Sequence, residues 1–180
     1  GYKKNIIIDY FKTEYNNIRI TYSQEEKPLG TGGALKKALQ YTNNAKVLVF
    51  NGDTFFNIDL FQFLRKTDKR DKIAIALKEM YNSSRYGSIE IKKNGIISKF
   101  REKHFFGKSY INGGIYLLRK DIFENYNKDV FSFEFFLENN YQRLNAKGIV
   151  FDNDYFIDIG IPEDYEKAQL DFKEIKFDNI

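Results

Sequence analysis

Val47-Leu48-Val49-Phe50-Asn51-Gly52-Asp53-Thr54 is the stretch that decides the fold class of this sequence. Its short Val-rich run predicts a buried central strand, and Asp53 follows in the loop at the end of that strand. In open α/β sheets, ligands bind in the crevice outside the carboxyl ends of the strands. Asp53 is therefore a candidate ligand of a divalent metal, which in turn can hold phosphates. The alternative is that Asp53 and Thr54 only turn the chain and cap the next helix.

The composition is that of a globular protein. The 180 residues suffice for one domain with a sizeable core, and 42% of them are hydrophobic. The net charge of +4 comes from interspersed charges, which suits an anionic small ligand but gives little support to nucleic-acid binding. No cysteine is present, and no apolar run reaches the roughly 18 residues that cross a membrane, so we expect a cytoplasmic protein without disulfides. The 17% aromatic content leaves room for a homodimer interface without locating one.

Apolar spacing predicts an alternation of helices and strands. Helices are expected over 3–13, after residue 34, and over 58–69, 121–126, 132–144 and 162–172. Strands are expected over 18–22, 47–50, 73–77, 86–91, 96–100, 110–118, 149–151 and 155–160, with a hairpin turn at Asn94-Gly95. In the helix over 58–69, Leu60, Phe61 and Leu64 should face inward. This order indicates one α/β domain with a mostly parallel sheet and an antiparallel insertion.

Two glycine-rich segments suggest contact with a ligand. Gly30-Thr31-Gly32-Gly33-Ala34 lies between a predicted strand and a predicted helix. Glycines let the backbone approach a ligand closely, and free N–H groups at a helix N-terminus attract anions. The alternative is a turn in which Thr31 caps the helix. Asn112-Gly113-Gly114 interrupts a predicted strand, which also suggests close approach of a ligand to the backbone.

Six motifs follow one another along the chain. They are Leu29-Gly30-Thr31-Gly32-Gly33-Ala34, Asn51-Gly52-Asp53, Tyr86-Gly87, Glu102-Lys103, Asn112-Gly113-Gly114 and Phe156-Ile157-Asp158-Ile159-Gly160-Ile161-Pro162-Glu163-Asp164-Tyr165. In this order they resemble the sugar-phosphate nucleotidyltransferase family over nearly the whole chain. The resemblance implies a Rossmann-like three-layer α/β fold with a mixed, mostly parallel central sheet and an antiparallel insertion, in a single nucleotidyltransferase domain over 1–180.

The resemblance also implies a reaction. A sugar 1-phosphate attacks the α-phosphate of an NTP, an NDP-sugar forms and pyrophosphate leaves, so positioning and charge neutralisation carry the catalysis. The implied cofactor is Mg²⁺, held by Asp53 and Asp158, because two carboxylates suit a hard cation. For Asp158 the alternative is an N-cap or turn role before Pro162. The implied partners are the two substrates, with no nucleic acid and no membrane.

By the same resemblance, further residues surround the substrates. Lys103 contacts the sugar phosphate as a point charge, with a solvated surface lysine as the alternative. Glu134 faces the sugar, and the alternative is that its charge only stabilises the start of a helix. The implied catalytic residues are Asp53, Lys103 and Asp158; the nucleotide-binding residues are Glu25, Pro28, Gly30, Thr31, Gly52 and Asp53; the sugar-binding residues are Gly87, Glu102, Asn112, Gly114 and Glu134.

The base and the sugar are less tightly specified. A carboxylate such as Glu25 can accept hydrogen bonds from the N1–H and N2–H groups of guanine, which favours GTP. The alternative is that Glu25 and Glu26 belong to a solvated loop. The resemblance favours a heptose 1-phosphate as the acceptor, with mannose, glucose or N-acetylmuramate 1-phosphate, or another base, as alternatives.

One part of the family pattern is not found in this sequence. The family begins with a strand and a G-G-x-G-T-R loop followed by a P-K pair, which hold the triphosphate. That unit would span on the order of 30 residues, and we expect that this sequence, and not the natural protein, lacks it. Two other functions stay open: a non-catalytic nucleotide-sugar-binding protein, and a glycosyltransferase, which the absence of a D-x-D pair at Asn51-Gly52-Asp53 disfavours.

Overall fold

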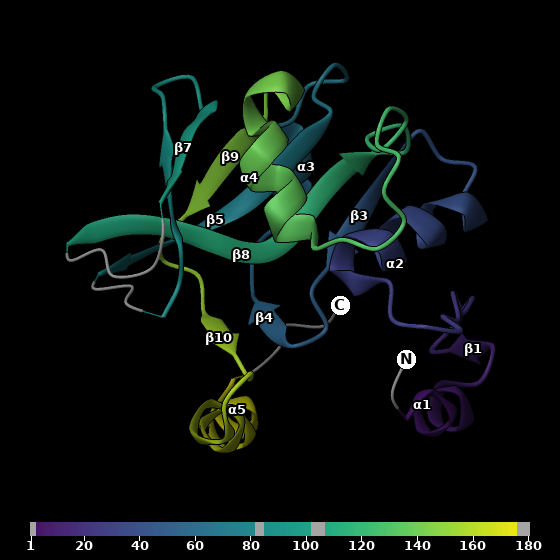
Figure 1. Ribbon diagram of the computed structural model, residues 1–180. Coiled ribbons are helices and arrows are strands. Elements are labelled where there is room, and N and C mark those ends of the chain that lie inside the picture. Colours follow the sequence, from purple (N-terminus) through teal and green to yellow (C-terminus); the bar gives the residue numbers. More distant parts are fainter. Residues whose placement is uncertain (1–2, 82–84, 102–106, 176–180) are drawn as a thin grey trace. The chain divides into compact units, whose positions relative to one another are not determined.

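The computed structural model describes residues 3–81, 85–101 and 107–175 of the chain (Figure 1). The chain divides into two compact units. The first unit comprises residues 1–45 and 123–140, and the second comprises residues 46–122 and 141–180. Helix α4 (Phe133–Leu144) contributes residues to both units. Within the described ranges, no helix combines the length and the hydrophobicity that a membrane crossing requires.

The second unit is built on a six-stranded mixed sheet. The order of the strands is β7-β6-β8-β5-β9, and β3 pairs with β8 beside this path. Every strand that the sequence predicts between residues 47 and 160 is found, with shifted ends. The six strands of the sheet are β3 (Lys46–Phe50), β5 (Ile73–Tyr81), β6 (Ser88–Ile91), β7 (Ile97–Arg101), β8 (Lys108–Arg119) and β9 (Lys147–Phe151). The predicted α/β fold with a mixed sheet is therefore confirmed.

Strand directions differ from the mostly parallel pairing that the sequence predicts. Only β5 and β9 pair in parallel among the described strands of this sheet, and the other pairings are antiparallel. The reason is β8, a 12-residue strand that runs between β3 and β5 and is antiparallel to both. Within the described part of the chain, β3 pairs with β8 alone. Its residues Val47, Leu48 and Val49 are accordingly only half-buried.

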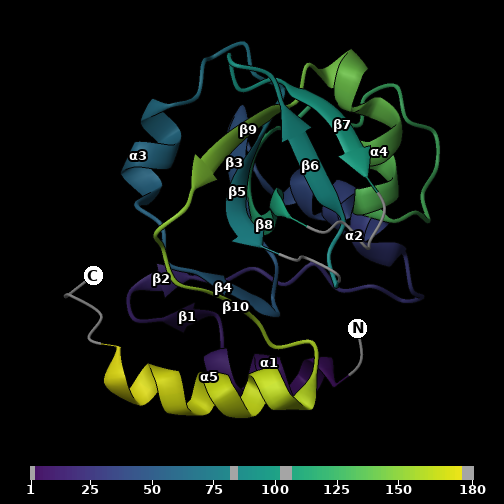
Figure 2. The ribbon, with the colours of Figure 1, turned by 90° about the vertical axis from the view of Figure 1, so that its left-hand side faces the viewer.

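The two edges of the sheet meet at the start of β7. Ile96 forms an antiparallel bridge with Lys147, which is the first residue of β9. Ile97 N–H donates to the Ala146 carbonyl at 2.8 Å, and Gly148 N–H donates to the Gly95 carbonyl at 2.8 Å. Figure 2 shows β6 and β7 turning back toward β9. The predicted Asn94-Gly95 turn makes this possible, since Gly95 adopts the left-handed conformation with φ of 81°.

One face of the sheet in the second unit packs on α3 (Leu60–Arg65). The core cluster there consists of Phe56, Phe63, Ala74, Ala76, Ile115, Leu117, Ile149 and Phe151. Asp59 caps α3, because its Oδ1 accepts from Gln62 N–H at 2.9 Å. The predicted inward face of this helix is partly wrong: Phe63 is fully buried, whereas Phe61 and Leu64 are 76% and 37% exposed. The cap also starts the helix at Leu60, two residues later than predicted.

A separate two-stranded ribbon completes the second unit. It pairs β4 (Thr54–Phe56) with β10 (Phe156–Asp158) in antiparallel register. Helix α5 (Pro162–Glu174) follows β10, with Pro162 in its first turn as predicted. The Tyr155 hydroxyl donates to the Asp171 carboxylate at 2.5 Å, which ties α5 to the segment before β10.

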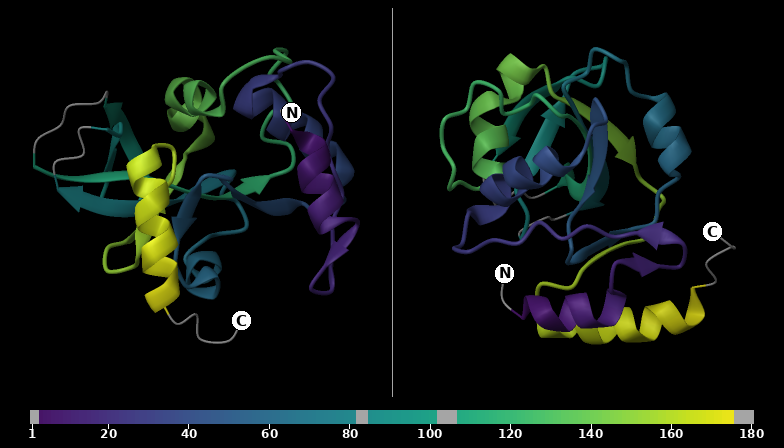
Figure 3. Two further views of the ribbon diagram at one scale, coloured as in Figure 1. Left: turned by 90° about the horizontal axis from the view of Figure 1, so that it is seen from below. Right: turned by 90° about the vertical axis from the view of Figure 1, so that its right-hand side faces the viewer.

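The first unit contains α1 (Lys4–Phe11), β1 (Glu14–Tyr15), β2 (Ile18–Arg19), α2 (Gly30–Ala38), the 3₁₀ turn η1 (Leu39–Tyr41) and the start of α4. Figure 3 shows α1 beside the β1–β2 hairpin, where the Phe11 and Tyr15 rings lie 5.1 Å apart. The predicted helix over 121–126 is wrong. That segment is a run of turns, in which Tyr126 N–H donates to the Phe123 carbonyl three residues earlier.

Candidate active site

Two acidic residues from distant parts of the sequence are neighbours on the β4–β10 ribbon. Asp53 directly precedes β4, and Asp158 is the last residue of β10. The register pairs Thr54 with Asp158, and Ile159 N–H donates to the Asp53 carbonyl at 2.9 Å. The two aspartates therefore lie one step apart in register on adjacent strands. Asp53 is exposed and Asp158 is half-buried.

This pair has the donor set that Mg²⁺ uses in phosphate chemistry. Mg²⁺ is commonly bound by one or two carboxylates, with waters and substrate phosphates completing its shell. Among the residues that the structure describes, no group of three or more His, Cys, Asp or Glu side chains could hold a metal. Within the described ranges the ribbon therefore offers two carboxylates at most, so a metal here would need phosphate oxygens and waters to complete its shell.

Tyr86 and Arg85 lie beside Asp158 and the first turn of α5. Burial raises the pKa of the Tyr86 phenol, and the negative charge of Asp158 raises it further. Arg85 forms an ion pair with Asp164 at 2.6 Å and lies over the Tyr86 ring, 5.6 Å from its centroid. The hydrogen bond to Asp164 raises the pKa of Arg85. The Asp158 carboxylate itself accepts from Gly160 N–H at 2.8 Å, which is the contact of the turn role considered for Asp158.

A bulge in β8 brings the predicted sugar-binding residues next to the acidic pair. Ile75 pairs with Tyr116 but Leu77 pairs with Asn112, so β8 contains two extra residues between these positions. Gly114 in the bulge has φ of 74°. Its carbonyl accepts from Asn51 N–H at 2.8 Å, which joins the bulge to the loop that contains Asp53.

The polar atoms of Asn112 are used within the bulge. Its Oδ1 accepts from Gly114 N–H at 3.1 Å, and its Nδ2 donates to the Tyr116 hydroxyl at 2.8 Å. Gly113 is required by packing, because a Cβ there would lie 2.4 Å from the Phe56 ring and 2.8 Å from the Ala76 carbonyl oxygen. Gly113, for which the sequence suggested close approach of a ligand, is therefore explained by contacts within the protein.

Gly87, the residue before β6, lies next to the bulge of β8. Ser88 pairs with Ile111 of β8, so the preceding residue, Gly87, lies beside Asn112 in register. The second unit thus brings together Gly52, Asp53, Gly87, Asn112, Gly114 and Asp158. Glu102 and Lys103 lie outside the described residues.

The remaining predicted residues lie in the first unit. The Glu25 carboxylate accepts from Leu29 N–H at 3.0 Å, immediately before α2 begins at Gly30. Pro28 is exposed in the same loop. Thr31 is not the N-cap of the helix, because α2 already includes it and Leu29 occupies the cap.

The expected free N–H groups of the glycine-rich segment are not found at Gly32 and Gly33. Both donate to the Phe131 carbonyl, at 2.9 and 3.3 Å. Both residues are buried, and a Cβ at Gly32 would lie 2.2 Å from the Phe131 ring. These two glycines therefore serve the packing of α2 on the segment before α4.

Glu134 is held by two hydroxyl groups. Its carboxylate accepts from Ser132 Oγ at 2.7 Å and from Thr31 Oγ1 at 2.9 Å, and Thr31 Oγ1 accepts from Phe133 N–H at 2.8 Å. Glu134 also lies in the first turn of α4, where a negative charge is favourable. This supports the structural alternative considered for Glu134, and its role toward the sugar stays a prediction.

Sequence reasoning missed Tyr86, Arg85 and Phe131. Tyr86 belongs to a motif in which only the glycine was singled out. Arg85 finds its partner Asp164 far along the chain, so no local pattern signals it. The signal for Phe131 lies in Gly32 and Gly33, whose missing side chains make room for another part of the protein.

Comparison with known proteins agrees with this geometry. The family model described as "Nucleotidyl transferase" matches residues 2–175. The chain is 48% identical over 166 residues to a D-glycero-alpha-D-manno-heptose 1-phosphate guanylyltransferase of Campylobacter jejuni, covering 92% of this chain and 73% of that protein. It is 43% identical over 176 residues to a protein of the same name from Aneurinibacillus thermoaerophilus, covering 96% and 76%.

Solved structures have the same fold. A crystal structure of HddC from Yersinia pseudotuberculosis superposes with a TM-score of 0.80 at 36% identity, covering 95% of this chain and 75% of that one. HddC complexed with GMP-PN gives a TM-score of 0.79, with the same identity and coverage. The resemblance found in the sequence motifs is confirmed: this chain belongs to the nucleotidyl transferase family.

Proposed function

We propose that this protein transfers a nucleotidyl group from GTP to a heptose 1-phosphate, giving an NDP-sugar and pyrophosphate. The observation that carries the proposal is the acidic pair Asp53 and Asp158, joined through Asn51 to the glycine bulge of β8. The names of the two guanylyltransferase relatives and the HddC complex with GMP-PN support the choice of base and sugar. The alternatives are another base, or a mannose, glucose or N-acetylmuramate 1-phosphate.

The reaction is an in-line displacement at phosphorus. A phosphate oxygen of the sugar 1-phosphate forms a bond to the α-phosphorus of the NTP, the bond to the bridging oxygen breaks, and pyrophosphate takes the electron pair. When bound, Mg²⁺ neutralises charge that develops on the phosphates. Asp53 and Asp158 would hold it, and Gly160 N–H, which donates to Asp158 Oδ1 at 2.8 Å, would keep that carboxylate in place. Lys103 would contact the sugar phosphate as a point charge.

Each substrate has proposed contacts. The sugar would lie near Gly87, Glu102 and the backbone of Asn112 and Gly114, with Glu134 as a further contact. The nucleotide would lie near Gly52, Asp53, Pro28, Gly30 and Thr31, and near Glu25. One oxygen of the Glu25 carboxylate is fixed by Leu29 N–H, and the other would accept from guanine.

The test is pyrophosphate release by the full-length protein with Mg²⁺, across four NTPs and a panel of sugar 1-phosphates. We expect release with GTP and a heptose phosphate. The variants Asp53→Asn and Asp158→Asn should lower kcat by roughly 100-fold or more, since each removes a carboxylate that stabilises charge in the transition state. Asp152→Asn, an exposed aspartate on the same unit, is the matched control and should retain activity. Full activity in both acidic variants would overturn the proposal, and binding of NDP-sugar without pyrophosphate release would indicate a non-catalytic binder.

Three further features belong to this proposal. Residues 1–180 form a single nucleotidyltransferase domain, which the family match over 2–175 supports. The resemblance also implies an N-terminal strand and a phosphate-binding loop, and these stay a prediction. The reaction takes place in the cytoplasm, where NTPs are available. The protein forms a homodimer, which sedimentation measurements would test.

A further inference from the structure

Arg85 is a cation that faces two carboxylates of the second unit, and one of them, Asp158, is a proposed metal ligand. Its Nη1 forms an ion pair with Asp164 at 2.6 Å. The hydrogen bond to Asp164 is the main cause that raises the pKa of Arg85, and the negative charge of Asp158 also raises it. Because an arginine side chain is always charged, Arg85 would compete with a metal ion for Asp158 if Asp164 did not hold it.

Aromatic contacts place Arg85 beside the strand that ends at Asp158. The Arg85 guanidinium lies 5.6 Å from the centroid of the Tyr86 ring. That ring in turn lies 6.1 Å from the Phe156 ring, in an edge-to-face arrangement. Phe156 is the first residue of β10 and Asp158 is the last. These contacts do not involve Asp164, so we expect Arg85 to stay close to Asp158 when the charge of Asp164 is removed.

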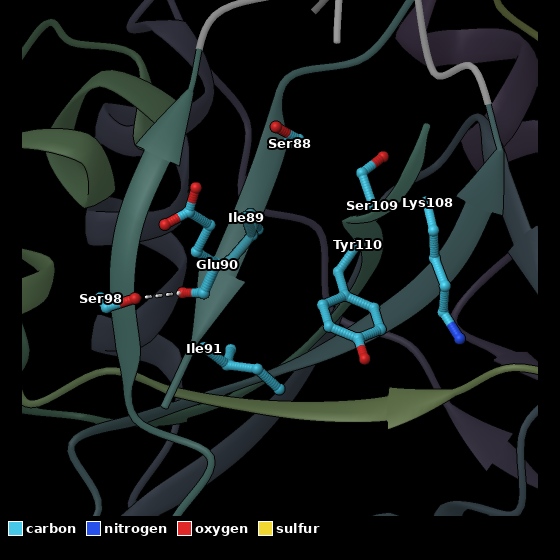
Figure 4. Close-up of a pocket in the computed structure, with 8 residues that line it drawn as sticks. All are labelled: Ser88, Ile89, Glu90, Ile91, Ser98, Lys108, Ser109 and Tyr110. Atoms are coloured by element: carbon cyan, nitrogen blue, oxygen red, sulfur yellow. Dashed lines mark hydrogen bonds between the residues drawn. The ribbon is translucent and has the colours of Figure 1, made fainter. Parts of the chain in front are cut away.

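The backbone that follows Arg85 is anchored on both sides. Ser88, three residues further along the chain, pairs with β7 and with β8. Figure 4 shows β6 between these two strands, where Ser98 Oγ of β7 donates to the Glu90 carbonyl at 3.2 Å. Release from Asp164 should therefore change the partner of the Arg85 side chain and leave the course of the chain unchanged.

The Asp158 carboxylate suits either cation. Gly160 N–H donates to its Oδ1 at 2.8 Å, so Oδ2 is the oxygen that a cation would approach. A guanidinium forms charge-assisted hydrogen bonds with a carboxylate, and Mg²⁺ binds the same oxygens. An ion pair of Arg85 with Asp158 would therefore weaken metal binding there.

Asp164 is well placed to hold Arg85. It lies in the first turn of α5, where a negative charge is favourable. The simplest explanation of the pair is that it fastens α5 to the chain before β6. However, the side chains of Arg85 and Asp164 are 46% and 24% exposed, and ion pairs of such exposure contribute little to folding stability.

We propose that Asp164 is a positioning residue, which holds Arg85 away from Asp158 and so keeps the Asp158 carboxylate available to the metal. The inference rests on the proposed function, in which Asp158 holds Mg²⁺. Neutralising Asp164 alone should weaken metal binding, and neutralising Arg85 as well should restore it. An ion pair that only fastens α5 predicts no such restoration, because the double variant lacks the pair too.

The first experiment is a Mg²⁺ titration of the full-length protein, followed by the amide chemical shifts of residues 53 and 158–160 in NMR spectra. Asp164→Asn should raise the Kd for Mg²⁺ roughly threefold to fivefold, the effect of one partly exposed ion pair. Glu163→Gln removes the same charge from the same turn of α5 and is the matched control, which should bind like the wild type. An unchanged Kd in Asp164→Asn, or an equal loss in Glu163→Gln, would overturn the inference.

The double variant Arg85→Gln/Asp164→Asn is the sharper test. It should bind Mg²⁺ with the Kd of the wild type, and so should Arg85→Gln alone, since Arg85 is already held by Asp164. A double variant as weak as Asp164→Asn would overturn the inference. The Mg²⁺ concentration for half-maximal pyrophosphate release should follow the same order across the variants, with an unchanged KM for the sugar 1-phosphate.

The titration also separates this inference from the proposed function. A wild type whose amide shifts at residues 53 and 158 do not respond to Mg²⁺ would contradict the proposed metal site, and the role of Asp164 would fall with it. A wild type that binds Mg²⁺ there, with the same Kd in Asp164→Asn, would refute the role of Asp164 alone.

Discussion

Replacement of Gly113 by alanine tests whether the glycine bulge serves packing or ligand approach. The new Cβ would lie 2.4 Å from Cδ1 and 2.5 Å from Cε1 of Phe56, and 2.8 Å from the Ala76 carbonyl oxygen. Contacts below 3.0 Å are not tolerated by real Cβ atoms, so one of the neighbours has to move. Ala76 is fully buried in the central strand β5, and the clash there involves its backbone.

The Phe56 ring has little room to retreat. It is 6% exposed and forms edge-to-face contacts with Phe156 and Phe151, at centroid distances of 5.5 and 6.2 Å. Overpacking of such a core costs about 1–3 kcal/mol. For a chain of this size each kcal/mol lowers Tm by about 2–4 °C, so Gly113→Ala should melt about 2–12 °C below the wild type.

The assay is thermal unfolding followed by circular dichroism, with Gly52→Ala as the matched control. A Cβ at Gly52 would meet no atom within 4 Å, so that variant should melt with the wild type. The reasoning is refuted if Gly113→Ala also melts with the wild type. If it then lost substrate binding, the glycine would serve the ligand, as the sequence first suggested.

Two other perturbations have expected outcomes. Gly32→Ala should lower the free energy of unfolding by about 1–3 kcal/mol in a urea titration, because its Cβ would lie 2.2 Å from a buried ring; an unchanged midpoint would contradict this. Hydrogen bonds from Lys167 and Tyr155 lower the pKa of Asp171 below its usual 3.8. The stabilisation from this carboxylate is therefore fully present above pH 3.8 and is lost as the pH falls through the lowered pKa. In Asp171→Asn, the free energy of unfolding should therefore fall less steeply at acidic pH than in the wild type. Identical pH profiles of the two proteins would exclude the effect.

Local patterns predicted the elements of this protein better than their arrangement. The Val-rich run before Asn51 and the Asn94-Gly95 turn were interpreted correctly, since strand and hairpin formation depend on neighbouring residues. The antiparallel pairing of β3 was not, because it depends on β8, which lies far along the chain. The predicted helix over 121–126 was also wrong, and the contacts of Phe123 and Tyr126 with the Phe136 ring of α4 are not visible in the local pattern.

The sequence by itself determined the family, the strand that ends before Asp53 and the two candidate carboxylates, because ordered motifs and apolar runs are visible along the chain. Only the tertiary structure decided that Asp53 and Asp158 share one ribbon, that Arg85 pairs with Asp164 and that Gly32 and Gly113 make room for aromatic rings. The physical reason is that side-chain neighbours across a sheet are set by strand register, which joins residues far apart in sequence.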